Sequence, residues 1–143
     1  MESVVELLQG LVQIPSVNPD GDAGVSPGGE KKVADLVSEF LEPYGFDSVF
    51  EEVEPGRPNL IARAPGSRNR PRILLGPHLD TVGVSGMTID PFSGSISEGK
   101  IHGRGASDTK GPMAAMLWGL RENAHLLEKL PIAVDFVGFM GEE

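Results

Sequence analysis

The sequence has 143 residues, of which 39% are hydrophobic and 23% charged, so it is long and apolar enough to fold as one domain. It contains no cysteine, which excludes disulfides, thiolate metal sites and a cysteine nucleophile. The net charge is −9 and there is no basic stripe, which argues against a nucleic-acid partner. No apolar run approaches the roughly 18 residues of a membrane helix, which argues against a membrane partner and favours a cytoplasmic protein.

The first half of the sequence predicts two amphipathic helices and two strands. Val4–Val12 carries leucines on one helical face, and Ser3 is placed to cap its start. Residues 14–29 are rich in proline and glycine and predict a loop. A second helix is predicted at 30–41, because apolar residues recur there at helical spacing. Strands are predicted at residues 46–53 and 59–64.

The second half predicts a strand–helix–strand unit with a small hairpin inside it. Residues 73–76 form a short apolar run, which is typical of a strand buried in a parallel sheet. Residues 93–103 predict a hairpin that turns at Glu98-Gly99. A helix at 112–121 and an apolar strand at 132–140 follow. Strand, helix and strand in this order predict a right-handed βαβ unit and hence an α/β fold.

Polar residues follow both strands of this unit, where ligands of such sheets bind. His78 and Asp80 come after the first strand, and their i, i+2 spacing puts both side chains on one side of an extended chain. The carboxylate of Asp80 could then hold the second ring nitrogen of a metal-bound His78. Glu142 and Glu143 follow the other strand, where one could bind a metal and the other act as general base. A hydrogen-bonded histidine and a solvated acidic pair are the simpler alternatives.

A glycine-rich segment, GRGASDTKG (103–111), places Asp108 just before the predicted central helix. Its glycines match neither the dinucleotide fingerprint nor the phosphate loop, which argues against a nucleotide-binding protein. Asp108 is therefore either a capping residue in a tight turn or a further functional carboxylate.

Three motifs in a fixed order resemble a known family. LLGPHLDTV (74–82), GRGASDTKGPMAAM (103–116) and FMGEE (139–143) are similar to the dinuclear zinc amidohydrolases of the M20 peptidase family, and LVQIPSVNP (11–19) is similar to its early loop. The resemblance covers nearly the whole chain. It implies a three-layer α/β/α catalytic domain with a mostly parallel sheet, and a deacylase or carboxypeptidase of amino-acid metabolism that hydrolyses the amide bond of an N-acyl amino acid or small peptide.

The resemblance also implies roles for individual residues. His78 would bind one Zn²⁺, Asp108 would bridge two Zn²⁺ ions and Glu143 would bind the second, with Co²⁺ or Mn²⁺ as substitutes. Glu142 would be the general base and Asp80 would orient His78. A non-proline cis peptide bond would follow Asp108. We expect these residues to converge at the carboxyl end of the sheet.

Two parts of the family pattern do not follow Glu143 in this sequence. The first is a further pair of metal ligands, one carboxylate and one histidine, and the second is the lid domain. We therefore expect residues 1–143 to be the N-terminal part of the catalytic domain, with the lid and dimerisation domain and the C-terminal part absent. By itself, the chain is then expected to bind zinc weakly, to leave an apolar edge that favours a homo-oligomer, and not to hydrolyse amides. The alternative is a non-catalytic truncated fragment that binds metal weakly.

Overall fold

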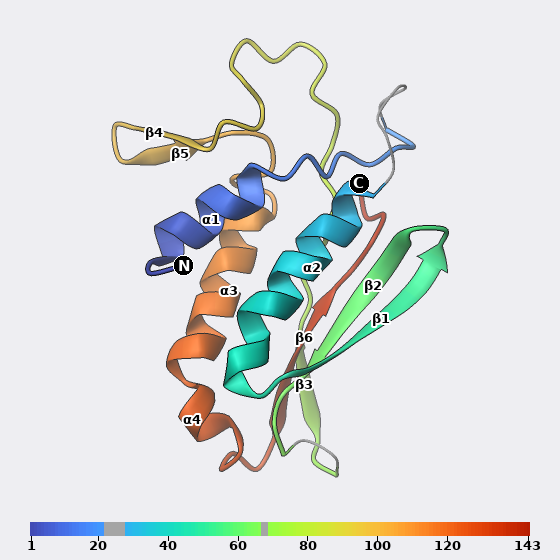
Figure 1. The fold of residues 1–143 in the computed structure, drawn as a ribbon, viewed down its shortest axis with the longest axis vertical. Coiled ribbons are helices and arrows are strands. Elements are labelled where there is room, and N and C mark those ends of the chain that lie inside the picture. Colours follow the sequence, from blue (N-terminus) through green and yellow to red (C-terminus); the bar gives the residue numbers. More distant parts are fainter. Residues whose placement is uncertain (22–27, 67–68) are drawn as a thin grey trace.

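A four-stranded sheet with helices packed on one face forms the body of the protein (Figure 1). The structure is a computed structural model, and it describes residues 1–21, 28–66 and 69–143. Residues 22–27 of the predicted loop lie outside the described residues. The helical elements are α1 (Val4–Val12), α2 (Gly29–Leu41), the 3-10 turn η1 (Glu42–Tyr44), α3 (Lys110–Glu122) and α4 (Ala124–Leu127). The strands are β1 (Asp47–Glu54), β2 (Arg57–Arg63), β3 (Arg72–Leu75), β4 (Ser95–Ser97), β5 (Lys100–His102) and β6 (Ala133–Gly138).

The first two helices form where the apolar spacing predicted them. The Ser3 side chain accepts a hydrogen bond from the backbone N–H of Glu6 at 3.2 Å and so caps α1. The α2 helix begins one residue before its predicted start, at Gly29. A side chain at Gly29 would collide with the backbone of Pro15, since its Cβ would lie 2.0 Å from the Pro15 carbonyl oxygen. The glycine thus lets the early loop cross closely over the start of α2.

The sheet is mixed, in the strand order β1-β2-β6-β3. The β1–β2 and β2–β6 pairs are antiparallel, and the β3–β6 pair is parallel. The α/β class is confirmed, as is a strand–helix–strand unit made by β3, α3 and β6. The expected mostly parallel arrangement is limited to that one pair. For β1 and β2 the reason is the short link between them, since only two residues separate these strands and so tight a connection joins antiparallel strands.

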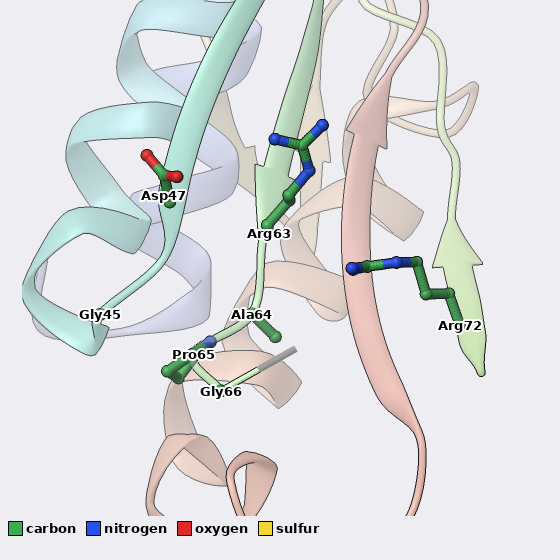
Figure 2. Close-up of a pocket in the computed structure, with 7 residues that line it drawn as sticks. All are labelled: Gly45, Asp47, Arg63, Ala64, Pro65, Gly66 and Arg72. Carbon is green, nitrogen blue, oxygen red and sulfur yellow. The ribbon is translucent and has the colours of Figure 1, made fainter. Parts of the chain in front are cut away.

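Only one face of the sheet is covered by helices among the described residues. Leu60 and Phe136 on that face are fully buried against α2 and its neighbours. The opposite face leaves Leu74 57% exposed, so the second helical layer that the resemblance implies is absent from the part of the chain described here. Figure 2 shows Arg63 on β2 and Arg72 on β3 on either side of β6, beside a hollow of about 660 Å³ at one end of the sheet.

A separate two-stranded hairpin, β4–β5, lies apart from the main sheet, as Figure 1 shows. Its turn is built by Glu98 and Gly99, which both have positive φ angles of 51° and 73°. Two positive φ angles in succession are the conformation that joins tightly paired antiparallel strands. The predicted hairpin and its turn are therefore confirmed. In the described ranges, no helix combines the length and the apolar character needed to cross a membrane.

A candidate metal centre

The motif residues lie where three extended segments run side by side beyond the sheet. His78 pairs with Phe139 in a parallel bridge, and the backbone N–H of Leu79 donates to the Phe139 carbonyl at 2.7 Å. On the other side, Thr81 pairs with Val17 in a second parallel bridge. The segment after β3 therefore lies between the early loop and the segment after β6. This arrangement brings residues from three distant parts of the sequence to one edge of the sheet.

The His78 ring stands between two sets of oxygen atoms. Its Nε2 lies 3.1 Å from Oδ1 of Asp108 and 4.0 Å from Oε2 of Glu142. Its Nδ1 lies 3.0 Å from the backbone carbonyl of Asp80 and 3.3 Å from the Asp80 carboxylate. When Nδ1 carries the proton and donates a hydrogen bond to the Asp80 carbonyl, the lone pair of Nε2 points at the acidic side chains.

The acidic surroundings of His78 favour a cation at the ring. Burial lowers the pKa of His78, but the hydrogen bonds to Asp108 and to the Asp80 backbone, with the charges of Asp80 and Glu142, raise it by more. The net result is a pKa above the ordinary value of 6.5. The same negative field that holds a proton on an imidazole also attracts a divalent metal.

Three side chains supply ligand atoms that lie within 4.8 Å of one another, and they belong to His78, Glu142 and Glu143. Asp108 adds a fourth, through its contact with His78. An imidazole nitrogen with carboxylate oxygens is a donor set that suits Zn²⁺, Co²⁺ or Mn²⁺. The Asp108 and Glu142 side chains are 79% and 65% exposed, so the site is open to a small molecule from outside.

Asp108 does not cap the helix that follows it. The N-cap position of α3 is Thr109, and its side chain makes no capping hydrogen bond. The peptide bond between Asp108 and Thr109 is cis, as the resemblance implied. Of the two interpretations left open for Asp108, the structure therefore disfavours the capping residue.

Asp80 is buried beneath the site and holds more than the histidine. Its side chain is almost fully shielded from solvent, and Oδ2 accepts hydrogen bonds from Asn18 Nδ2 at 2.9 Å and from the Glu143 backbone N–H at 3.0 Å. Sequence reasoning assigned Asp80 a role toward His78 only. The structure shows that the same carboxylate also fixes the backbone of a candidate ligand.

Sequence reasoning missed three polar residues that lie behind the site, namely Asn18, Glu30 and Arg57. Each is at least nine-tenths buried. Glu30 lies in the first turn of α2, where an exposed acid is common because its negative charge interacts favourably with the helix dipole. Arg57 follows a turn, where a solvated arginine is common. Burial of opposite charges is the property that marks them, and no local pattern in the sequence reveals it.

Comparisons with known proteins give a consistent result. Residues 74–143 match the family model described as peptidase family M20/M25/M40. The succinyl-diaminopimelate desuccinylases of Methylobacterium radiotolerans and Methylobacterium nodulans are 35% and 38% identical to this chain, over 81% and 95% of its length. The matches cover 28% and 32% of those enzymes, so the chain spans less than a third of their length.

The fold has solved relatives as well. The M20 family metallo-carboxypeptidase Sso-CP2 from Sulfolobus solfataricus superposes with a TM-score of 0.75 at 26% sequence identity. The superposition covers 97% of this chain and 31% of that one. The described α/β arrangement is therefore the arrangement found in a metal-dependent carboxypeptidase.

Proposed function

Because this chain belongs to the M20/M25/M40 peptidase family, a family of hydrolases, we propose that its candidate site binds divalent metal and serves hydrolysis of the amide bond of an N-acyl amino acid or a small peptide. The names of the relatives support both substrate classes, since one group removes a succinyl group from an amino acid and another is a carboxypeptidase. These relatives favour the hydrolase over the non-catalytic alternative. Hydrolysis is proposed for a protein of the relatives' full length, and metal binding for the 143 residues themselves.

The proposed metal ligands are His78, Asp108 and Glu143, with Asp108 shared between two ions. The contact of His78 Nε2 with Asp108 at 3.1 Å and the proximity of Glu143 support this set. Zn²⁺ is the proposed metal, since imidazole and carboxylate ligands suit it. Metal ions held by these residues would polarise a substrate carbonyl and lower the pKa of water, and so would supply a nucleophile at neutral pH.

Glu142 is the proposed general base. Its side chain is 65% exposed and its Oε2 lies 4.0 Å from His78 Nε2, so it can reach a water molecule beside the ligands. A carboxylate in this place takes a proton from the attacking water and passes it to the departing amine. Asp80 acts through His78, because its backbone carbonyl lies 3.0 Å and its carboxylate 3.3 Å from Nδ1, which leaves Nε2 directed at the site.

The observation that carries the proposal is the convergence of His78, Glu142 and Glu143 within 4.8 Å, with Asp108 against the same histidine. The test is calorimetric titration of the 143-residue chain with Zn²⁺. We expect saturable binding that His78→Ala abolishes. The matched control is His125→Ala, which removes an exposed histidine on α4 and should leave binding unchanged. Equal Zn²⁺ affinity in the His78→Ala protein would contradict the proposal.

A further inference from the structure

A buried ion pair lies behind the candidate site. Arg57 is the first residue of β2 and Glu30 lies in the first turn of α2, and their side chains are only 4% and 2% exposed. Arg57 Nε donates to Glu30 Oε2 at 2.5 Å and Nη2 donates to Glu30 Oε1 at 3.1 Å. Two parallel bonds between a guanidinium and a carboxylate fix both groups in one plane. The pair is therefore a rigid point between the helix layer and the sheet.

The ion pair holds the backbone just before the two glutamates. The N–H of Gly141 donates to Glu30 Oε1 at 2.8 Å. Gly141 has a positive φ of 64°, and a Cβ there would lie 3.4 Å from Arg57 Nη2. The chain thus turns sharply against the ion pair one residue before Glu142. Because the glutamate side chains are exposed, their place depends on how this backbone is held.

A second connection runs from the ion pair to Glu143 itself. Arg57 Nη2 lies 3.4 Å from Asn18 Oδ1. The Asn18 Nδ2 group donates to the carbonyl of Glu143 at 2.5 Å and to Asp80 Oδ2 at 2.9 Å. Asp80 in turn accepts from the N–H of Glu143. Both backbone groups of Glu143 are therefore bound by buried side chains that connect to Arg57.

We propose that Glu30 and Arg57 are positioning residues, which hold the 141–143 backbone through Gly141 and Asn18 and so keep Glu142 and Glu143 against His78. Burying two charges costs desolvation, and a well-packed apolar pair is often as stable in such a place. What an apolar pair cannot supply is an acceptor for the Gly141 N–H. The effect on metal affinity rests on the proposed function, whereas the effect on the order of residues 141–143 does not.

The test separates positioning from stability with the double variant Glu30→Met/Arg57→Met. Replacing both charges leaves no unpaired buried ion, so the thermal unfolding midpoint should stay close to that of the parent chain. Heteronuclear ¹⁵N NOE values of Gly141, Glu142 and Glu143 should fall from those of the core to those of a mobile end. Zn²⁺ affinity measured by calorimetry should fall about 10- to 100-fold, the usual effect of losing a residue that supports a ligand.

A conservative variant and a control sharpen the result. Glu30→Gln keeps an oxygen that can accept from the Gly141 N–H, so residues 141–143 should remain more ordered than in the double variant, and Zn²⁺ affinity should fall less. Asp35→Asn removes the exposed ion pair with Lys31 further along α2, and it should change neither the NOE values of residues 141–143 nor the Zn²⁺ affinity. The Glu30→Gln protein also decides the proposal if the double variant does not fold, because NOE values and Zn²⁺ affinity that are both as unchanged as in Asp35→Asn would overturn it.

The two proposals fail in different ways. A double variant that folds, keeps residues 141–143 as ordered as in the parent, and binds Zn²⁺ equally well overturns the positioning role. Loss of order with unchanged Zn²⁺ affinity also overturns it, because the held backbone would then not support the ligands. A parent chain that binds no Zn²⁺ contradicts the proposed function, and the NOE values alone then decide whether the ion pair holds the segment.

Discussion

Two buried carboxylates, each bound by an arginine, lie near opposite ends of β2, and the two pairs differ in what else they hold. At one end, Glu30 and Arg57 bind the backbone of the segment that carries Glu142 and Glu143. At the other end, Asp135 on β6 accepts from Arg72 Nη1 at 2.5 Å and from the Ala64 N–H at 2.9 Å, and Figure 2 shows the Arg72 side chain reaching from β3 toward β6.

The chemistry of the two pairs is the same, since in each a nearly fully buried carboxylate is bound by a guanidinium. The Asp135 pair joins strands to each other, and its partner Arg72 is one-third exposed. The Glu30 pair joins the sheet to the candidate site. Burial of a charge therefore does not by itself mark a functional residue. The backbone group that the charge binds is what distinguishes positioning from stability.

The largest expected effect belongs to the two glutamates that the first pair holds. In a protein of the relatives' length, Glu142→Gln should keep bound metal and lose about 10²- to 10⁴-fold in turnover, the range of general-base catalysis. Glu143→Gln should lose metal instead. Metal content by atomic absorption and steady-state hydrolysis of N-succinyl-diaminopimelate measure the two properties. If Glu142→Gln is the variant that loses zinc, the roles of the two residues are exchanged.

Asp80→Asn should give the next largest effect. The Asp80 carboxylate lies 3.3 Å from His78 Nδ1 and also accepts from the Glu143 N–H, so its loss disturbs two proposed ligands. We expect Zn²⁺ affinity to fall about 10- to 100-fold while the circular dichroism spectrum stays unchanged. Unchanged affinity would show that the backbone carbonyl of Asp80 alone orients the histidine.

Asp135→Asn tests the other side of the comparison. Removing the charge weakens the contact between residue 135 and Arg72, and because Arg72 is partly solvated we expect a loss of only about 1–3 kcal/mol in the free energy of unfolding. Zn²⁺ affinity should be unchanged, since neither residue contacts the 141–143 segment. Urea unfolding and calorimetry measure the two quantities. A drop in Zn²⁺ affinity as large as that of Asp80→Asn would show that the Asp135–Arg72 pair also supports the candidate site, and the two pairs would then not differ in function.

The smallest expected effect is that of Asp35→Asn on stability. The Lys31–Asp35 pair joins side chains that are 50% and 42% exposed, and such i, i+4 pairs contribute about 0.3–0.5 kcal/mol. We expect a loss of that size in urea unfolding. A loss well above 1 kcal/mol would mean that exposed charges along α2 also contribute strongly to stability, and that Glu30 does not differ from them in this respect.

Local sequence patterns predicted the helices and the convergence of His78 with Glu142 and Glu143 well, and the sheet less well. Ser3 and the spacing of leucines fixed α1, because capping and helical period are local properties. His78 and Glu142 could be placed together because each follows an apolar run, and parallel strands end at one edge. Whether β2 and β6 pair in parallel is decided by contacts distant in sequence, so the short apolar runs did not reveal the antiparallel pair.

The residues behind the site could not be predicted, for a related reason. Arg57 and Glu30 are 27 positions apart, and Glu30 and Gly141 are 111 apart. Neither separation follows a helical or strand period, and each charge alone resembles an ordinary surface charge. Only the folded chain shows that Glu30 and Arg57 are buried together against the Gly141 backbone, one residue before Glu142.

The most direct test of a metal centre at His78 is a crystal of the zinc-soaked chain with anomalous diffraction measured at the zinc edge. The account predicts a peak about 2.0–2.1 Å from His78 Nε2 that also contacts a carboxylate oxygen of Asp108. A second ion, about 3.5–4 Å away beside Glu143, would complete the dinuclear arrangement. Zinc bound only elsewhere, for example at His102 or His125, with none beside His78, would contradict the account.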